Sequence, residues 1–268
     1  MLLSSPHNPT LKQLQKLLHK SKARKTLNRF VIEGEREVLR AIAAGYAIEA
    51  FFLLEGAVVS PETQKMMAQT QAKHYELPPK LLHKVAVRST TEQMVAVAVS
   101  KEHSLSQLKL PKKAFVLVIE AAEKPGNIGA ILRTAAAFQI DAVLIADPKT
   151  DLYNPHIIRA SLGGLFFVPI AEASSAEILA YLNEQNMAIA TAALAPNNTK
   201  SNQFKYQLPC AVVMGSEDRG VSSLWLEAAT HIVKIPMTDH IDSLNLSVSA
   251  GILMYEALAK NGRLKDSL

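Results

Sequence analysis

The sequence predicts an α/β protein with two domains. Strand and helix patterns alternate through most of the 268 residues, which is typical of sheets whose strands are joined by helices. Several strands of the second half are continuous apolar runs, as expected for a parallel sheet that helices cover on both faces. Residues 101–113 hold five charged residues and show little periodicity, so we place the boundary there and expect domains at 1–105 and 114–268.

The first domain is predicted to be a small α/β unit that opens with an amphipathic helix. Leucines recur at helical spacing over residues 10–20, with lysine and glutamine between them, and Asn8-Pro9 supplies a start signal. The remaining patterns predict strands at 29–34, 49–54, 74–77 and 95–100 and helices at 35–44, 61–72 and 78–84.

The second domain shows a clearer alternation of apolar strands and longer helices. Its predicted strands are residues 115–120, 142–146, 167–169, 187–191, 210–214 and 231–235. Its predicted helices are residues 128–139, 155–161, 175–186, 223–229 and 243–261. No Gly-x-Gly-x-x-Gly follows any of these strands, so the dinucleotide-binding fingerprint is missing.

The net charge of +5 is unevenly distributed along the chain. Residues 1–113 hold 18 Lys/Arg against 9 Asp/Glu, whereas residues 114–268 hold 11 against 15. A basic N-terminal part indicates docking to a polyanion, although a solvated basic helix would explain the same charges. The candidate contacts for such a partner are Lys12, Lys16, Lys22, Arg24, Lys25 and Arg29.

Composition also limits the classes of protein to consider. No apolar run approaches the ~20 residues that cross a bilayer, and the N-terminus lacks a secretory pattern, so a cytoplasmic protein without a membrane partner is expected. The single cysteine, Cys210, opens an apolar strand, which favours a small buried hydrophobe over a reactive thiol. No cysteine and histidine cluster has metal-ligand spacing, so no metal is expected.

A first motif, residues 123–135, follows the strand at 115–120. Asn127 is positioned to cap the helix that follows, and small residues leave the helix start uncrowded. Arg133 is an isolated charge on an otherwise apolar helix, so it must find a partner or face an opening. A structural ion pair within the sheet and helix layers is the alternative reading.

Two further motifs repeat this pattern of small and polar residues after a strand. In residues 213–222, Gly215 permits close approach of the backbone to a ligand and Glu217 can orient a polar group, although taken alone the segment is better explained as a plain turn. In residues 235–251, Ser243 and Asn245 lie where a loop becomes a helix, and free backbone N–H groups there can hold polar ligand atoms. A tightly packed internal helix is the alternative for this segment.

Taken together and in this order, the three motifs resemble the signature motifs of the SpoU (TrmH) family of RNA 2′-O-ribose methyltransferases, of the SPOUT class. The resemblance covers nearly all of residues 114–268. It implies a parallel-sheet domain tied in a deep trefoil knot, S-adenosylmethionine as cofactor and a homodimer. More weakly, residues 5–9 and 30–34 resemble the ribosomal-protein (L30-like) substrate-binding domain that precedes the catalytic domain in many members.

The resemblance also assigns roles to individual residues. Asn127 and Arg133 match residues of the catalytic centre, and Glu217, Ser243 and Asn245 match further polar residues of the site. The backbone at Gly215, Ile235 and Leu244 matches positions that hold the cofactor, with Met237 beside them. The sequence departs from the commonest pattern at Lys124, Gln139 and Asp239, where Asp, Gly and Gly are frequent.

The expected activity is therefore methyl transfer from S-adenosylmethionine to a ribose 2′-hydroxyl of structured RNA. Ribosomal RNA is favoured over transfer RNA because a separate N-terminal domain is present. A non-catalytic RNA-binding protein with the same fold is one alternative, which the intact polar residues of the motifs argue against. A nicotinamide-dependent oxidoreductase is another, and the missing glycine fingerprint counts against it.

Overall fold

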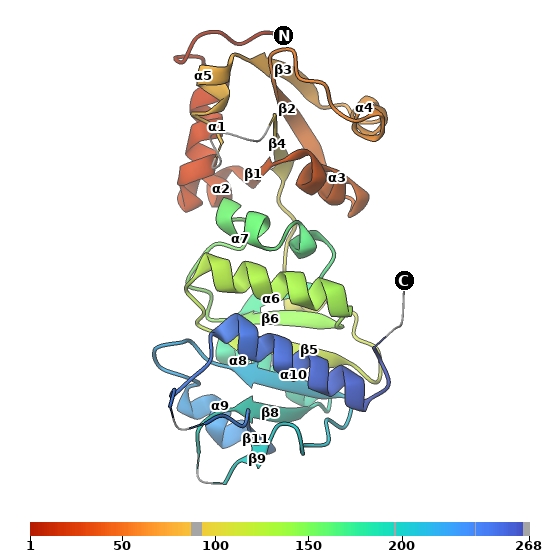
Figure 1. Ribbon diagram of the computed structural model, residues 1–268, viewed down its shortest axis with the longest axis vertical. Helices are drawn as coiled ribbons and strands as arrows, with labels where there is room; N and C mark the ends of the chain where they lie inside the picture. Colours follow the sequence, from red (N-terminus) through yellow and green to blue (C-terminus); the bar gives the residue numbers. More distant parts are fainter. Residues whose placement is uncertain (87–92, 196, 239, 265–268) are drawn as a thin grey trace. The chain divides into compact units, whose positions relative to one another are not determined.

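The computed structural model describes residues 1–86, 93–195, 197–238 and 240–264. The chain divides into two compact units, coloured along the sequence in Figure 1. Unit 1 contains Met1–Glu102 and Asp151–Phe167, and unit 2 contains His103–Thr150 and Val168–Leu268. By packing, residues 151–167 therefore belong with the N-terminal residues, which the predicted range 114–268 does not anticipate.

Unit 1 is built on a four-stranded sheet with the order β1-β4-β2-β3. The strands are β1 (Arg29–Glu33), β2 (Ile48–Leu54), β3 (Lys73–Leu77) and β4 (Met94–Val99). Strands β1 and β2 both pair antiparallel with β4, and β3 pairs parallel with β2. The helices of its N-terminal part are α1 (Pro9–His19), α2 (Ser21–Leu27), α3 (Glu35–Ala43), α4 (Pro61–Ala68) and α5 (Pro79–Leu82).

Helix α1 confirms the predicted amphipathic helix. Its four leucines, Leu11, Leu14, Leu17 and Leu18, are all buried, and the Asn8 side chain accepts a hydrogen bond from the backbone N–H of Thr10. Helix α2 was not predicted, because its seven residues carry no apolar stripe that would reveal a period.

The segment Asp151–Phe167 forms α7 (Pro155–Ala160) and the 3₁₀ turn η2 (Gly164–Phe166) within unit 1. Its first residue, Asp151, forms an ion pair with Arg24, which is only 4% exposed. The Arg24 guanidinium also donates to the carbonyls of Leu17 at 2.7 Å and Leu18 at 3.2 Å. The ring of Tyr153 stacks on Phe30 with 4.2 Å between centroids. A buried charge pair and aromatic packing thus hold this segment on the N-terminal residues.

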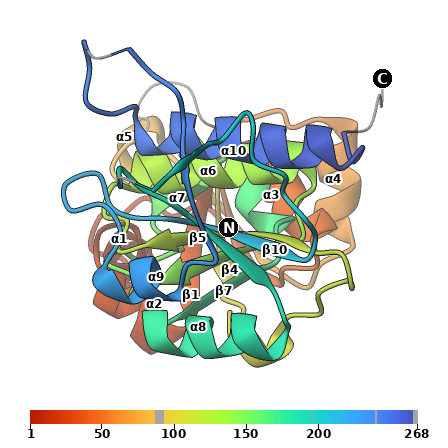
Figure 2. The ribbon, with the colours of Figure 1, turned by 90° about the horizontal axis from the view of Figure 1, so that it is seen from below.

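Unit 2 is built on a seven-stranded sheet with the order β7-β6-β5-β10-β8-β11-β9, in which every pair is parallel. The strands are β5 (Phe115–Glu120), β6 (Ala142–Ala146), β7 (Ile170–Ala173), β8 (Ala188–Ala192), β9 (Thr199–Lys200), β10 (Cys210–Met214) and β11 (His231–Lys234). Helices α6 (Pro125–Phe138) and α10 (Leu246–Lys260) cover one face, and α8 (Ser175–Glu184) and α9 (Ser223–Ala228) cover the other (Figure 2). The 3₁₀ turn η1 (Leu105–Gln107) precedes the sheet.

The predicted α/β class with a parallel sheet is confirmed, and the strands predicted at 115–120, 142–146 and 210–214 have the bounds of β5, β6 and β10. The strand predicted at 167–169 is wrong. Phe167 is exposed at the end of the segment that packs with unit 1, and the strand β7 begins only at Ile170. The trefoil knot stays a prediction.

Two further features of the chain concern its single cysteine and its helices. Cys210 is buried at the start of β10, the middle strand of the sheet of unit 2, and burial raises the pKa of its thiol to about 12, as expected for a cysteine that serves as a small hydrophobe. No helix in the described part of the chain combines the length and the apolar character that crossing a bilayer requires.

We predict that Asp151→Ala lowers the free energy of unfolding by about 3 kcal/mol, because it leaves the buried Arg24 guanidinium without its carboxylate. The double variant Arg24→Met/Asp151→Leu should be more stable than Asp151→Ala, since it removes both charges. Urea unfolding measures both, with Lys22→Ala on the exposed side of α2 as a control. Equal stability of Asp151→Ala and the wild-type protein would contradict the importance of the pair.

Candidate functional site

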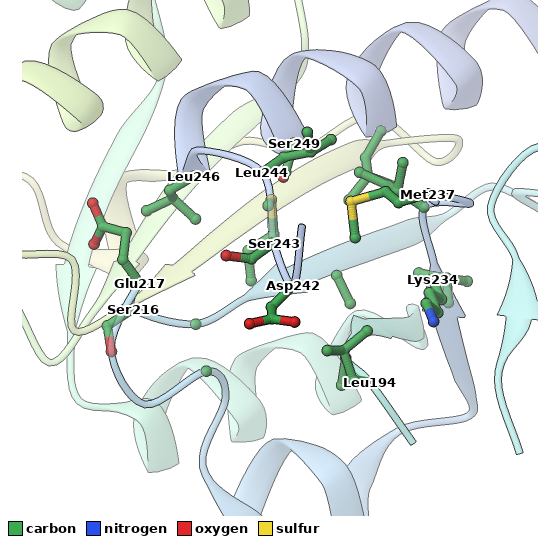
Figure 3. Close-up of a pocket in the computed structure, with 18 residues that line it drawn as sticks. Leu194, Ser216, Glu217, Lys234, Met237, Asp242, Ser243, Leu244, Leu246 and Ser249 are labelled. Atoms are coloured by element: carbon green, nitrogen blue, oxygen red, sulfur yellow. The ribbon is translucent and has the colours of Figure 1, made fainter. Parts of the chain in front are cut away.

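A cavity of about 310 Å³ opens at the carboxyl edge of the parallel sheet of unit 2 (Figure 3). The strands β8, β10 and β11 are neighbours, and the residues that follow each of them reach the cavity together with the start of α10. Parallel strands present their carboxyl ends at one edge, which is where ligands bind in open α/β sheets. The lining residues are Ala192–Leu194, Met214–Glu217, Gly220, Val233–Ile235, Met237, Asp242–Leu244, Leu246, Ser249 and Leu253.

The predicted cofactor-binding residues all line this cavity. Gly215, Ile235, Met237 and Leu244 belong to its wall, which is made mainly of aliphatic side chains and backbone. In the view of Figure 3, Ser216 and Glu217 lie on one side of the cavity and Lys234 and Met237 on the other. A few polar side chains therefore interrupt a largely apolar cavity wall, as is usual for small-molecule sites.

Gly215 is required by the backbone that surrounds it. A Cβ atom at this position would overlap the carbonyl group of Gly220 and the backbone N of Val221. The turn is closed by a hydrogen bond from the N–H of Gly220 to the carbonyl of Ser216 at 3.0 Å. The end of β10 and the returning chain thus approach each other more closely than any residue with a side chain permits.

Asn127, Glu217 and Asn245 form a hydrogen-bonded group that joins the three motifs. The Asn127 side-chain amide donates to the Glu217 carboxylate, and its oxygen accepts from the Asn245 amide at 3.1 Å. The oxygen of Asn245 in turn accepts from the backbone N–H of Ser247 at 2.9 Å. Asn245 is therefore the N-cap of α10, and the cap also fixes the direction of its amide group.

The prediction that Asn127 caps the helix of the first motif is wrong. Helix α6 begins at Pro125 with Lys124 as its N-cap, and Pro125 supplies the fixed φ that suits a first helical residue. The side chain of Asn127 is free of that task and reaches Glu217 and Asn245 instead. Lys124, a departure from the family pattern, places its Nζ 3.8 Å from the Glu217 carboxylate.

Of the five predicted catalytic residues, the structure brings four together. Glu217 and Ser243 line the cavity, Asn127 donates a hydrogen bond to Glu217, and Asn245 donates one to Asn127. Arg133 is exposed and is neither a lining residue nor a hydrogen-bond partner of this group in the described part of the chain. Six residues along α6 rotate a side chain by about 240° and advance it by about 9 Å from Asn127.

Sequence reasoning missed several lining residues. Residues 192–194 form the end of β8 and the start of the loop after it, at the same edge, yet nothing in the sequence places β8 between β10 and β11. Asp242 lies in the third motif but was not singled out, and its carboxylate is exposed in the loop that borders the cavity. Asp239, a departure noted above, lies outside the described residues.

The candidate RNA contacts of unit 1 divide into two groups. Lys12, Lys16, Lys22 and Lys25 are exposed on α1 and α2. The prediction of Arg24 is wrong, because its guanidinium is buried and bound to Asp151.

Arg29 is half-buried and is largely occupied within unit 1. It forms an ion pair with Glu49 and donates to the carbonyls of Leu27 and Asn28. In the residues that the structure describes, no three His, Cys, Asp or Glu side chains gather as metal ligands would.

The fold and cavity define the class as a two-unit α/β protein with a small-molecule site at the carboxyl edge of a parallel sheet. Residues 114–255 match the SpoU rRNA Methylase family, and residues 8–96 match the MRM3-like substrate binding domain. The chain therefore belongs to the SpoU rRNA methylase family, whose members are methyltransferases that use S-adenosylmethionine.

Individual relatives extend over nearly the whole chain. The 23S rRNA (guanosine(2553)-2′-O)-methyltransferase RlmP of Bacillus subtilis is 27% identical, with 94% of this chain and 97% of the relative covered. A crystal structure of an RNA 2′-O ribose methyltransferase is 37% identical with a TM-score of 0.84, over 97% of this chain and 99% of that one. The AdoMet-bound rRNA methyltransferase from Sinorhizobium meliloti has a TM-score of 0.89 at 23% identity, over 97% of both chains, and supports the fold.

We predict that Gly215→Ala weakens binding of S-adenosylmethionine at least tenfold, because the added methyl group forces the turn away from the end of β10. Isothermal calorimetry measures the affinity. Gly126→Ala is the matched control, since a Cβ there meets open space and α6 tolerates alanine well. Unchanged affinity of Gly215→Ala would show that the close approach of the two backbone segments is not needed for the site.

Proposed function

We propose that this protein transfers a methyl group from S-adenosylmethionine to a ribose 2′-hydroxyl of RNA, with ribosomal RNA as the substrate. The observation that carries this proposal is the hydrogen-bonded group of Asn127, Glu217 and Asn245 beside the cavity. Membership of the SpoU family and the activity of the Bacillus subtilis relative support it.

The cavity suits the proposed cofactor in size and in the chemistry of its wall. Its volume lies at the lower end of the range for small-molecule sites, and its aliphatic lining suits the adenine and ribose of an adenosyl group. The backbone at Gly215, Ile235 and Leu244, with Met237 beside it, would hold that group. The carboxylates of Glu217 and Asp242 suit the positively charged sulfonium and ammonium groups of the cofactor. When bound, S-adenosylmethionine supplies a methyl group on a sulfonium, a leaving group that needs no acid or metal.

The residues of the hydrogen-bonded group would orient the ribose. Because Asn127 is held by Glu217 on one side and Asn245 on the other, its amide cannot rotate freely. Ser243, in the loop that leads to Asn245, places a hydroxyl at the cavity wall. Fixed polar groups beside the cavity would hold a 2′-hydroxyl in line with the methyl group, and positioning of this kind lowers the barrier substantially.

Arg133 is proposed to bind the phosphate next to the reacting ribose and to stabilise the developing alkoxide. A guanidinium rarely gives up its proton, so we do not assign it the role of general base. Its exposure on α6 leaves the guanidinium accessible to RNA. The proton of the hydroxyl would leave through phosphate or water.

Unit 1 is proposed to dock the RNA through its exposed lysines on α1 and α2. Lys12, Lys16, Lys22 and Lys25 would contact phosphates, which adds affinity without reading sequence. The match of residues 8–96 to a substrate-binding domain supports this assignment.

We also propose that the protein is a homodimer, paired through the outer face of α6 and α10. Val248 and Tyr255 lie seven residues apart on α10, hence on one stripe, and are 51% and 54% exposed. The Tyr255 ring lies 6.2 Å from that of Phe138 on α6, so the apolar face continues onto the second helix. A second copy of the chain would cover this face, as the family resemblance implies.

For the reaction, we predict that Arg133→Lys slows methyl transfer about 100-fold while leaving S-adenosylmethionine affinity unchanged, since lysine cannot form a two-pronged contact with phosphate. Single-turnover transfer of tritiated methyl to total RNA from cells lacking the gene measures the rate. Arg159→Lys, an exposed arginine of α7, is the control. Near-normal transfer by Arg133→Lys would refute the contact, and cofactor binding without any transfer by the wild-type protein would refute the proposed reaction.

For the assembly, we predict that Val248→Glu/Tyr255→Lys yields a monomer, because charges replace the apolar stripe. Sedimentation equilibrium at micromolar concentration measures the mass of both proteins. Leu226→Glu, which alters an exposed apolar residue on α9, should leave the wild-type mass unchanged. A wild-type protein that sediments as a monomer would contradict the dimer.

A further inference from the structure

Unit 2 contains a second hollow, of about 570 Å³, at the amino edge of its sheet. Its walls come from Lys113, just before β5, and from residues 203–208, just before the neighbouring strand β10. Lys260 and Asn261 at the end of α10 complete it. Since the candidate site lies at the first turn of α10, the length of this helix separates the two by about 21 Å.

The hollow is basic, although residues 114–268 carry more acidic than basic residues. Lys113 and Lys205 are exposed at its rim, and Lys112 is exposed next to Lys113. The sequence holds no Asp or Glu at 103–119 or at 185–216, and the part of the chain described here places no carboxylate in the lining. Within the described residues, no carboxylate of the lining therefore competes with an anion for these lysines.

Among the described residues, two carboxylates that contact neighbours of the hollow are engaged by other groups. Asp141 accepts from Arg263 at 2.6 Å and from the backbone N–H of Phe115 at 2.7 Å. Glu256 accepts a hydrogen bond from the Tyr206 hydroxyl at 3.2 Å. The pKa of Tyr206 is raised, mainly by burial and further by the nearby Glu256 carboxylate. Arg263 also donates to the carbonyl of Lys113 at 3.4 Å, so the backbone that carries this lysine is anchored.

The loop that carries Lys205 is pinned to the end of α10. The Lys260 ammonium donates to the carbonyls of Ser201 at 2.8 Å and Phe204 at 2.9 Å. The Asn261 side chain donates to the carbonyl of Tyr206 at 2.8 Å. A loop held at three points loses little freedom when a ligand binds, which favours binding.

Side chains along this loop alternate between the interior and the surface. Phe204 and Tyr206 are buried, and their rings meet edge to face at 4.8 Å between centroids. Gln203, Lys205 and Gln207 are exposed and border the hollow. One cation flanked by two amide donors is thus presented outward by a loop whose other side is anchored in the core.

We propose that Lys112, Lys113 and Lys205, together called the lysine ledge, bind the phosphodiester backbone of the RNA that the protein methylates. Ammonium and amide groups match phosphate oxygens, and such contacts strengthen binding without reading sequence. A distance of about 21 Å corresponds to on the order of six nucleotide steps, so one RNA segment of ordinary length can reach both sites. The inference rests on the proposed function, because it assigns the ledge to the same RNA.

The test is binding of a fluorescein-labelled 24-nucleotide RNA hairpin, followed by anisotropy over a series of salt concentrations. Lys113→Ala/Lys205→Ala should bind about fivefold to tenfold more weakly at 100 mM salt, with a salt dependence less steep by about 1.5, since two phosphate contacts are lost. Lys113→Arg/Lys205→Arg should retain most of the affinity. Lys149→Ala, an exposed lysine elsewhere in unit 2, is the matched control. Calorimetry with S-adenosylmethionine and thermal unfolding should be the same for all variants.

Unchanged affinity and unchanged salt dependence in the alanine double variant, with methyl transfer by the wild-type protein intact, would overturn the ledge and leave the proposed function standing. Calorimetry with tripolyphosphate tests a free anion as the ligand. Loss of tripolyphosphate binding in the alanine double variant, with RNA affinity retained, would assign the hollow to a free anion and would also overturn the ledge. Weaker RNA binding by the variant, with no methyl transfer by the wild-type protein, would support the RNA contact and overturn the proposed reaction.

Discussion

The parallel direction of all seven strands in unit 2 is the constraint on which the site depends. It gathers the ends of β8, β10 and β11 at one edge, although residues 193–209 and 215–230 lie between these strands in the chain. The backbone of Gly215 then passes close to that of Gly220 and Val221, and Glu217 accepts a hydrogen bond from Asn127 of α6. Without this convergence, Asn127, Glu217 and Asn245 would be unrelated polar residues at three helix and strand ends.

The sequence predicted the strands whose burial is complete and the polar residues that follow them. Residues 115–120, 142–146 and 210–214 are continuous apolar runs, and such runs leave little choice of structure in a covered parallel sheet. The order of strands in the sheet could not be predicted, because strand pairing depends on contacts between segments far apart in the chain. For the same reason residues 192–194 were missed, and Asn127 was taken for a local cap when its partners lie 90 and 118 residues away.

Charge in the sequence indicated a polyanion but did not show which cations are accessible. Arg24 and Lys25 are adjacent, yet one is buried with Asp151 and the other is exposed on α2. The overall acidic balance of residues 114–268 likewise concealed Lys205, whose surroundings contain no carboxylate over a long stretch of chain. The backbone conformation of Gln139 was likewise not predicted: this residue adopts the left-handed conformation at the end of α6, which glycine adopts without strain.

The chain passes between the two units three times, after Glu102, after Thr150 and after Phe167. An exchange of N-terminal halves between relatives at a single crossover near residue 102 would therefore split the cluster around Arg24. The incoming half would carry a guanidinium suited to its own parent, while the aspartate, the stacking tyrosine and α7 would come from the other. Exchange of the N-terminal segment alone is consequently hindered in this architecture, because residues 1–102 and 151–167 must remain compatible within unit 1.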